Sequence, residues 1–331
     1  MWDILGMMMA DISIIWVLIA AMVLDVALGD PAWLFKYVAH PVVYIGRMID
    51  FFDQRLNNWK LGKTSLVMRG YLILVILFLS GLLVGVALEF LLSWSLYLLP
   101  IKIFLIAIFL AIRSLYIHVK AVYFALNQGL VEAKAAVAKI VGRDVTHMTE
   151  ISVSRAAIES LAENMSDGVI APIFWYLVGG LPGLIAYKCI NTADSMIGHK
   201  NFKYIHFGRA VALCDDILNF VPARLTAGLF LIMGFLGGGG SKARGIWVCL
   251  RQDAMRHASP NAGWPEAAMA KVMDIALGGP RIYGDEKVEG VWLNEAGRDI
   301  LHRADIKQAL KLYVMALFLL VALLLPFSVF L

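Results

Sequence analysis

Long apolar runs constrain this chain more than any other feature of its sequence. Residues 12–29, 71–92, 96–112 and 312–331 are four such runs, and only 16% of the 331 residues are charged. An ordinary soluble domain has about 25% charged residues. Because lipid offers no hydrogen-bond partners to the backbone, such runs are expected to form helices unless a closed barrel is built. The alternating short segments typical of a barrel are lacking, so we predict an all-α, polytopic integral membrane protein with about four to six membrane segments.

Two further apolar stretches leave the number of segments open. Residues 169–187 are interrupted by prolines and glycines, and residues 225–240 are short and end in four glycines. A spanning helix needs about 20 apolar residues, and broken helices are tolerated in the membrane where they line a cavity. We expect both stretches to be re-entrant or steeply tilted, which would keep the loop 188–224 on the same side as residues 113–168. If both cross fully, these two polar parts lie on opposite sides.

The polar parts fit into a single membrane domain, residues 1–331. Residues 113–168 are expected to form a cytoplasmic helical loop with helices at 119–141 and 149–164, and residues 241–311 a cytoplasmic lobe. The spacing of apolar residues in 40–56 predicts an amphipathic helix on the membrane surface. Six basic residues in each of the loops 30–70 and 113–168 place both loops in the cytoplasm. The expected location is the inner (cytoplasmic) membrane, with the active site facing the cytoplasm.

Several kinds of site are disfavoured by the composition. A net charge of +4 is modest, and the basic residues lie in loops, so we interpret them as topology determinants and phosphate contacts and not as a nucleic-acid surface. Three cysteines without CxxC spacing do not indicate structural zinc. The segment GGGGSKARG lacks the GxxxxGK[ST] spacing of a phosphate-binding loop. A nucleotide would therefore have to be held by magnesium on carboxylates, by basic side chains or by helix N-termini.

Acidic and amide side chains gather in three clusters within this apolar chain. The clusters are Glu159, Glu163, Asn164 and Asp167; Asn191 and Asp194; and Asp215, Asp216 and Asn219. Six carboxylates at roughly 3 kcal/mol each would cost on the order of 18 kcal/mol in bare lipid. They must therefore face water, pair with cations or bind a metal, and oxygen ligands suit Mg²⁺ shared with a phosphate.

Structural roles compete with this interpretation in two of the clusters. Glu159 and Glu163 share a helical face with Arg155, which could pair with them, and Asp167 could cap the segment that follows. Asn191 and Asp194 could likewise cap a helix. The adjacent pair Asp215–Asp216 is harder to explain without a cation, because neighbouring carboxylates repel each other. We therefore expect a metal at the third cluster.

Five motifs in a fixed order carry a resemblance to a known family. They are GRDV (142–145), RAAIESLAENMSDGVIAP (155–172), NTADSMIGH (191–199), DDILNFVPARLTA (215–227) and SPNAGWPEAAMA (259–270). With LGDP, HPV and LGGPRIYG around them, they make the chain similar to the cobinamide-phosphate synthase family of cobalamin biosynthesis, the CbiB/CobD proteins. Together the motifs are specific, although no one of them is.

The resemblance implies an amide-forming carbon–nitrogen ligase. Its substrates would be adenosylcobyric acid, ATP and (R)-1-amino-2-propanol or its O-phosphate, and its product adenosylcobinamide or adenosylcobinamide phosphate. A carboxylate is a poor electrophile, so ATP would first activate it, with Mg²⁺ neutralising the phosphates. Besides the lipid bilayer, other membrane enzymes of cobalamin assembly and a second copy of the chain are candidate partners.

The residues of the five motifs receive roles through this resemblance. Catalytic roles fall to Glu159, Glu163, Asp167 and Asp194, with Glu163 or Asp167 as the base. Metal ligands would be Asp215, Asp216 and Asn219. Substrate and ATP contacts would come from Arg143, Asp144, Asn164, Lys188, Asn191, Ser195, Arg224, His257, Ser259, Asn261, Trp264 and Glu266, with Asn261 and Trp264 holding the corrinoid.

Two other function classes share some of these features. A Mg²⁺-dependent prenyl or phosphatidyl transferase also places acidic motifs on membrane helices, but the SPNAGWPE segment argues against it. A non-catalytic transporter or membrane sensor would use carboxylates inside the spans as an ion path. Most of the carboxylates here lie at the predicted ends of segments.

Overall fold

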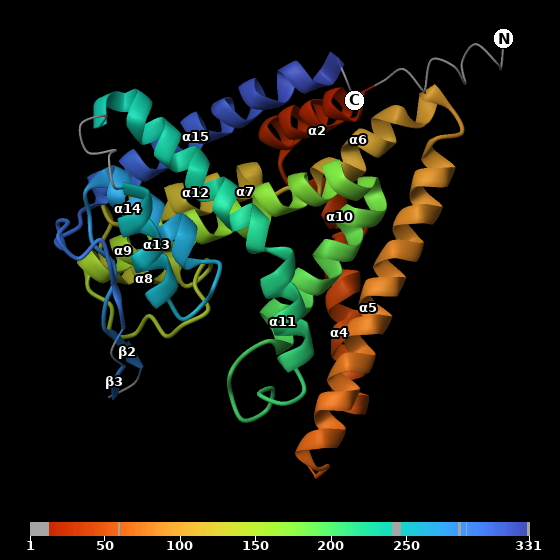
Figure 1. Ribbon diagram of the computed structural model, residues 1–331, viewed down its shortest axis with the longest axis horizontal. Helices are drawn as coiled ribbons and strands as arrows, with labels where there is room; N and C mark the ends of the chain where they lie inside the picture. The colour runs from red at the N-terminus through yellow and green to blue at the C-terminus, as the bar shows by residue number, and fades with distance from the viewer. Residues whose placement is uncertain (1–12, 59, 240–245, 284–285, 289, 330–331) are drawn as a thin grey trace. The chain divides into compact units, whose positions relative to one another are not determined.

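The computed structural model describes residues 13–58, 60–239, 246–283, 286–288 and 290–329, and most of them are helical (Figure 1). The chain divides into two compact units. The first combines the residues up to Ala111 with Ala171–Asn219 and the last residues from Phe327, and the second combines Ile112–Ile170 with Phe220–Pro326. The predicted polar parts, 113–168 and 241–311, both fall in the second unit. That the whole chain forms one membrane domain stays a prediction.

The first unit begins with an apolar helix and an amphipathic one. Helix α2 (Ile14–Leu28) starts where the Ser13 hydroxyl accepts the Ile15 N–H and ends at Gly29, whose φ is 60°. The short helix α3 (Ala32–Phe35) leads to α4 (Pro41–Leu56), which buries Ile45 and Ile49. The predicted helices at 12–29 and 40–56 are thus confirmed, while the position of α4 on a membrane surface stays a prediction.

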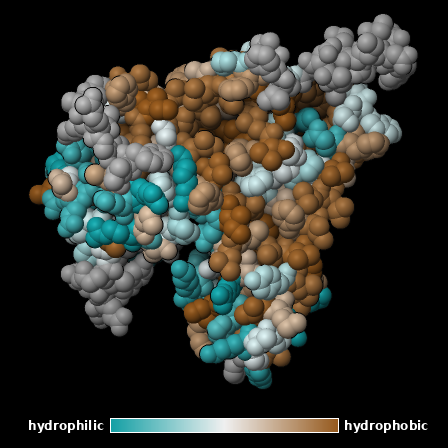
Figure 2. Space-filling view, viewed as in Figure 1, coloured by the Kyte–Doolittle hydropathy of each residue, from teal (hydrophilic) through white to brown (hydrophobic). Residues whose placement is uncertain are grey.

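Helix α5 (Lys63–Leu92) is the longest uninterrupted helix of the first unit. Its 30 residues extend about 45 Å, more than the ~30 Å hydrocarbon core of a bilayer. Large apolar side chains such as Leu83 and Phe90 are exposed along its outer face, which is brown in Figure 2. This face has the composition of a surface in contact with lipid.

Glycines of α5 let a second helix pack directly against its backbone. That helix is α10 (Ala171–Ile197), which runs beside α5 in Figure 1. A Cβ atom at Gly85 would lie 2.3 Å from Pro182 Cα, and one at Gly81 would lie 2.8 Å from Ala186 Cα. Neither distance is compatible with a larger residue, so the two glycines define this contact.

Helix α10 is broken inside its apolar part, as the sequence predicted. Gly179 and Gly180 have non-helical dihedral angles, and Gly180 takes φ 59° and ψ −150°. Beyond the break the chain turns back so closely that a Cβ at Gly183 would lie 2.4 Å from the Trp175 carbonyl oxygen. The Glu89 carboxylate, which also pairs with Lys102, accepts the Leu181 N–H at 3.3 Å. A side chain of α5 thus satisfies the helix end that the break creates.

The predicted loop at 188–224 is wrong, because most of it is helical. Helix α10 continues to Ile197, and α11 covers Arg209–Leu218. The polar side chains that suggested a loop bond back to their own helix: Thr192 donates to the Lys188 carbonyl and Ser195 to the Asn191 carbonyl. Such bonds to the carbonyl four residues earlier let polar residues occupy a helix interior.

The apolar run 96–112 is less regular than predicted. A 3₁₀ turn at Leu96–Leu98 precedes α6 (Leu99–Ala107), and Ile108–Ala111 are not helical. The second unit then starts with α7 (Ile112–Ala125) and α8 (Leu130–Val137). The single helix predicted at 119–141 is therefore wrong. Gly129, with φ 146°, separates the two helices in a conformation that only glycine adopts readily.

The second unit continues with four more helices. The helix predicted at 149–164 is confirmed as α9 (Glu150–Met165), which a π turn at Ser166–Ile170 joins to α10. Helix α12 (Phe220–Gly234) is followed by a second π turn at Phe235–Gly239. Helices α13 (Ile246–Arg256) and α14 (Gly263–Met273) belong to the predicted polar lobe.

The lobe also contains short strands that the sequence did not predict. Strand β1 (Leu277–Gly278) pairs antiparallel with β4 (Trp292–Leu293), and β2 (Arg281–Tyr283) with β3 (Glu286–Val288). The last helix, α15 (Arg303–Leu324), begins nine residues before the predicted run 312–331. The reason is a polar cap: Asp305 accepts the His302 N–H at 2.7 Å and pairs with Arg298 at 2.6 Å.

Five helical stretches among the described residues are long and apolar enough to cross a membrane. They are Lys63–Leu92, Leu96–Ala125, Glu150–Ile197, Phe220–Gly237 and Arg303–Ser328, and Ile14–Leu28 is a shorter apolar helix. This confirms the all-α, multi-pass fold with four to six membrane segments. The side on which each loop lies stays a prediction.

The break in α10 generates the first testable prediction. Gly180→Ala should lower the unfolding free energy by about 1–3 kcal/mol, because its φ and ψ lie in a region open essentially to glycine alone. Gly179→Ala is the matched control: its φ is −140° and nothing lies within 4 Å of its added Cβ. Thermal unfolding in detergent measures both variants. Equal melting temperatures for the two would contradict the described backbone.

Candidate functional site

The first unit holds a polar cluster between α10 and α11. Asn219 donates to Asp215 at 2.8 Å and accepts the Tyr187 hydroxyl at 2.9 Å. Asn191 donates to the other Asp215 oxygen at 3.4 Å. Asp215 and Asn219 are only 7% and 1% exposed. The predicted common face of Asp215 and Asn219 is therefore present, and the fold adds Asn191 to it.

Negative charge dominates this cluster. Burial raises the pKa of Asp215 to about 7, and the charges of Asp194 and Asp216 act in the same direction against the hydrogen bonds from Asn219 and Asn191. Burial also raises the pKa of Asp216, and the positive charge of Lys200 partly offsets this rise. The buried Asp215 carboxylate is thus influenced by two half-buried carboxylates, Asp194 and Asp216. A bound cation would relieve their repulsion.

The donor set fits magnesium better than a metal that needs many protein ligands. Among the described residues, no three His, Cys, Asp or Glu side chains gather as a metal site. Mg²⁺ keeps several waters and is often held by one or two carboxylates together with substrate phosphates. Asp215 and Asp216 could serve in this way. Asn219, whose amide oxygen accepts the Tyr187 hydroxyl, orients Asp215 in this arrangement, and its role as a ligand stays a prediction.

The remaining predicted residues of this unit also lie on α10. Lys188 is buried, Asp194 is half-buried, and Ser195 is exposed with its hydroxyl bonded to the Asn191 carbonyl. Asn191 and Asp194 lie inside the continuous helix, so neither caps a helix start. Their alternative role as caps is therefore wrong.

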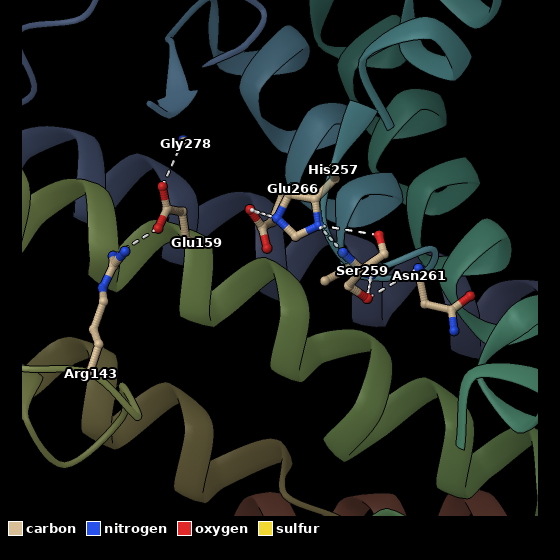
Figure 3. Close-up of polar contacts among 8 residues, drawn as sticks. Arg143, Glu159, His257, Ser259, Asn261, Glu266 and Gly278 are labelled. Carbon is tan, nitrogen blue, oxygen red and sulfur yellow. Dashed lines mark hydrogen bonds and ion pairs between the residues drawn. The ribbon is translucent and has the colours of Figure 1, made fainter. Parts of the chain in front are cut away.

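In the second unit, Glu159 ties three parts of the chain together (Figure 3). Its Oε2 atom accepts from Arg143 at 2.9 Å, and its Oε1 atom accepts the Gly278 N–H at 2.7 Å. The sequence suggested Arg155 as the partner, one turn away on α9. The ion pair is with Arg143 instead, and Arg155 donates to the Asp299 carbonyl at 2.8 Å and lies over the Trp292 ring at 4.7 Å. Glu159 therefore positions the loop before α9 and strand β1.

Glu163, Asn164 and Asp167 follow Glu159 on one continuous helical stretch. Asn164 donates to the Ser160 carbonyl at 2.9 Å, and Ser160 donates to the Ile140 carbonyl at 2.7 Å. Glu163 and Asp167 are half-buried. Asp167 lies in the π turn between α9 and α10, so it does not cap a new helix. Single π turns inside helices are frequent at functional sites.

In the second unit, a group of polar and aromatic side chains joins α12 to the start of α14. Arg224 donates to the Asn261 amide oxygen at 2.7 Å, and its guanidinium lies over the rings of Phe220 (3.8 Å) and Trp264 (4.6 Å). Trp264 is only 7% exposed. Most of its surface is therefore already in contact with protein, and its predicted corrinoid contact, with that of Asn261, stays a prediction.

His257 and Glu266 hold the loop between α13 and α14 (Figure 3). The His257 Nδ1 atom accepts the Ser259 N–H at 3.1 Å, and Nε2 lies 3.8 Å from Glu266 Oε2. The Ser259 hydroxyl accepts the N–H groups of Asn261 and Ala262. Both ring nitrogens of His257 thus face partners, which indicates a structural role.

A polar pocket of about 160 Å³ opens beside Glu159. Its lining residues are Arg143, Asp144, His147, Met148, Thr149, Ser152, Arg155, Glu159, Gly278 and Pro280. Hydrogen bonds from Thr146 hold the pKa of Asp144 below its usual range. The sequence predicted Arg143, Asp144 and Glu159 but missed His147, Ser152 and Arg155. His147 and Ser152 lie between the first two motifs and Arg155 begins the second, and these positions were the available signal.

The predicted residues therefore form separate clusters within the two units. Lys188, Asn191, Asp194, Ser195, Asp215, Asp216 and Asn219 belong to the first unit, and all the others belong to the second. The contact between Asp215 and Asn219 was predicted, whereas the contact of Asn191 with Asp215 was not. The convergence of Glu163, Asp194 and Asp216 on one divalent cation stays a prediction.

The fold and these clusters define a class: a multi-pass helical membrane protein whose carboxylate and arginine clusters are built into helix ends and helix junctions. Residues 18–313 match the family described as CobD/Cbib protein, and the chain belongs to this family. A relative from Rhizobium meliloti (strain 1021), named "Cobalamin biosynthesis protein CobD", is 44% identical over 92% of this chain and 94% of its own.

Further relatives carry the same name. The protein from Brucella suis biovar 1 (strain 1330) is 46% identical over 90% of this chain and 91% of its own. The protein from Rhodobacter capsulatus is 42% identical over 89% of this chain and 91% of its own. No solved structure matches the chain.

The raised pKa of Asp215 predicts how stability changes with pH. Between about pH 4 and pH 7 the folded state keeps a proton that the unfolded state has lost, so the unfolding free energy without metal should fall as pH rises through this window. The fall should be on the order of a few kcal/mol. Asp215→Asn should flatten it, and Asp50→Asn, on the exposed side of α4, should not. Denaturant unfolding in EDTA tests this, and identical slopes for wild type and Asp215→Asn would refute the pKa shift.

The Arg143–Glu159 pair generates a prediction for the second unit. Arg143→Met removes the ion-pair partner of the 5%-exposed Glu159 and should destabilise the protein by about 3–5 kcal/mol. Adding Glu159→Gln should recover part of this loss, because the buried charge is then removed. A double-mutant cycle by thermal unfolding measures the coupling. Additive effects would show that the two side chains do not interact.

Proposed function

We propose that this protein forms the amide bond between a carboxylate of adenosylcobyric acid and the amine of (R)-1-amino-2-propanol or its O-phosphate, using ATP. The product would be adenosylcobinamide or its phosphate. The observation that carries the proposal is membership of the CobD/Cbib family over residues 18–313, whose relatives are named for cobalamin biosynthesis. Membership supports a role in cobalamin biosynthesis, and the reaction is our inference from the resemblance to the cobinamide-phosphate synthase family, with which the chemistry of the site residues is consistent.

Amide formation from a carboxylate needs a leaving group. Transfer of the terminal phosphate of ATP to the substrate carboxylate gives an acyl phosphate. The amine nitrogen then forms the C–N bond as the bond between carbon and the phosphate oxygen breaks, and the phosphate takes the electron pair of that bond. One proton leaves the amine for a base. Glu163 or Asp167, half-buried on the stretch that follows Glu159, is our candidate base.

Magnesium is the cation that this proposal requires, and Asp215 and Asp216 are the residues that would hold it. Their fit rests on the buried carboxylate of Asp215 and on the charges of the half-buried Asp194 and Asp216, which raise its pKa further. When bound, Mg²⁺ would neutralise phosphate charge. Asn191 and Asn219 would keep the Asp215 carboxylate in position through their hydrogen bonds.

The basic and polar residues of the second unit have binding roles in this proposal. Arg143 and Asp144 belong to the pocket beside Glu159. Arg224, Asn261 and Trp264 form the cluster that joins α12 to α14, where we place the corrinoid. Corrinoids are large and carry amide groups, so stacking and hydrogen-bonding groups suit them. We propose the inner membrane as the location, with both units' sites facing the cytoplasm.

A second candidate is a Mg²⁺-dependent prenyl or phosphatidyl transferase. The observation in its favour is the interaction of acidic side chains from α10 and α11, which is the arrangement that a diphosphate-binding site needs. Ligand protection distinguishes the two functions, because only a bound ligand raises the melting temperature. Adenosylcobyric acid with ATP should raise it, and isoprenyl diphosphate should not.

The reaction itself is tested with purified protein, adenosylcobyric acid, ATP, Mg²⁺ and aminopropanol with or without its phosphate. Mass spectrometry should detect the amide product together with ADP, and AMP in place of ADP would show that the activated intermediate is an acyl adenylate. Asp215→Ala and Asp216→Ala should each lower kcat/KM on the order of 100-fold or more, because a divalent cation would lose its ligands. Asp50→Asn serves as the control. Full activity of both alanine variants would end the metal assignment, and no product with any amine would end the proposed reaction.

A further inference from the structure

The pocket beside Glu159 has features of an anion site, and the proposed function does not name the group that it binds. It lies at the amino-terminal end of α9, and seven of its ten lining residues have polar or charged side chains. Its volume of about 160 Å³ is below the roughly 300–1,000 Å³ of sites that enclose a drug-sized ligand. A pocket of this size suits one small charged group at the end of a larger molecule.

The loop that carries half of this pocket is fixed by its own side chains. Asp144 accepts the Thr146 N–H at 2.9 Å, and Lys134 donates to the Thr146 carbonyl. Arg143 is held by Glu159, which in turn holds the Gly278 N–H. The lining groups are thus in place before any ligand binds, which lowers the cost of binding.

Arg155 is the group in this pocket whose bonding capacity is least used. Its one hydrogen bond among the described residues goes to the carbonyl of Asp299, and Trp292 lies against the guanidinium. Its Nε atom is buried and has no hydrogen-bond partner among the described residues, so contacts with a ligand fall to the two terminal nitrogens of the guanidinium. The two acidic lining residues are occupied otherwise, Glu159 by Arg143 and Gly278, and Asp144 by Thr146. A guanidinium has five N–H donors, so further donors of Arg155 are available for a ligand.

The helix end adds a second contribution. Helix α9 has 16 residues, and the partial positive charge of its amino-terminal end falls on the part of the pocket lined by Thr149 and Ser152. Helix amino-termini and arginine forks are both recurrent devices for binding phosphate in proteins. His147, which is exposed on the same loop, adds a further donor.

We propose that this pocket binds the phosphate group of a substrate, with Arg155 and Arg143 as donors and His147 at the rim. The inference rests on the proposed function, which supplies two sources of such a group. One is the terminal phosphate of ATP, and the other is the phosphomonoester of aminopropanol O-phosphate. Arg155 and His147 thereby gain a binding role that the sequence motifs alone did not assign.

Binding by the full-length protein in detergent tests the pocket without requiring turnover. The probes are ATP, aminopropanol O-phosphate and unphosphorylated aminopropanol, each titrated by calorimetry against wild type and Arg155→Gln. Loss of a charge-assisted contact should weaken binding of one phosphorylated probe by roughly tenfold to a hundredfold. Arg155→Lys should recover part of the affinity. The matched control is Arg251→Gln, an exposed arginine on α13 outside the pocket, which should bind all probes as wild type does.

The two sources give different outcomes. A weakened affinity for ATP alone assigns the pocket to the nucleotide, and a weakened affinity for aminopropanol O-phosphate alone assigns it to the amine substrate. Unchanged binding of both by Arg155→Gln, with an unchanged melting temperature, overturns the proposal. If Arg155→Gln does not fold, His147→Asn replaces it, with an expected several-fold loss for the same probe, and unchanged binding of both phosphorylated probes by that variant overturns the proposal.

Failure of the pocket and failure of the reaction are separable. Product formation with unchanged KM values in Arg155→Gln would refute the pocket and leave the ligase proposal intact. Arginine-dependent binding of a phosphorylated probe without any product would refute the ligase reaction and leave the phosphate site intact.

Discussion

The cost of burying carboxylates in so apolar a chain governs where its polar residues lie. Glu89 is held by Lys102 and the Leu181 N–H, and Glu159 by Arg143 and the Gly278 N–H. Each of these acids joins segments that are far apart in the sequence, because a buried carboxylate needs hydrogen-bond and ion-pair partners and only the folded chain brings them close. Asp215 differs, since Asn191 and Asn219 give it neutral donors and its acidic neighbours add repulsion. That difference is why we propose a cation site at Asp215.

The fold could be predicted where the local sequence of a segment determines its secondary structure. The apolar runs became helices α2 and α5, and the glycines of 169–187 became the break in α10. The prediction failed where contacts beyond the local sequence pattern determine the structure. The polar residues of 188–224 suggested a loop, but hydrogen bonds to carbonyls one turn earlier and packing against α5 keep the segment helical. The β ribbons of the lobe are too short for their residues to show a strand pattern.

The residues of the candidate clusters could be predicted from the sequence, but most of their interaction partners could not. Asp215 and Asn219 are four residues apart at the end of α11, so their contact followed from helical geometry alone. The pairing of Glu159 with Arg143 spans a loop whose path no local pattern specifies. Arg155 was weighed as a partner of Glu159, and only the position of Trp292 and Asp299 shows that it faces a pocket.

The chain of contacts from Tyr187 through Asn219 to Asp215 has a fixed direction. The phenol donates to the amide oxygen, and the amide nitrogen donates to the carboxylate. A carboxamide neither gains nor loses a proton near neutral pH, so this chain can hold the carboxylate in one orientation but cannot conduct protons to it. Whatever proton Asp215 exchanges must therefore arrive by another route, through solvent or through a bound reactant.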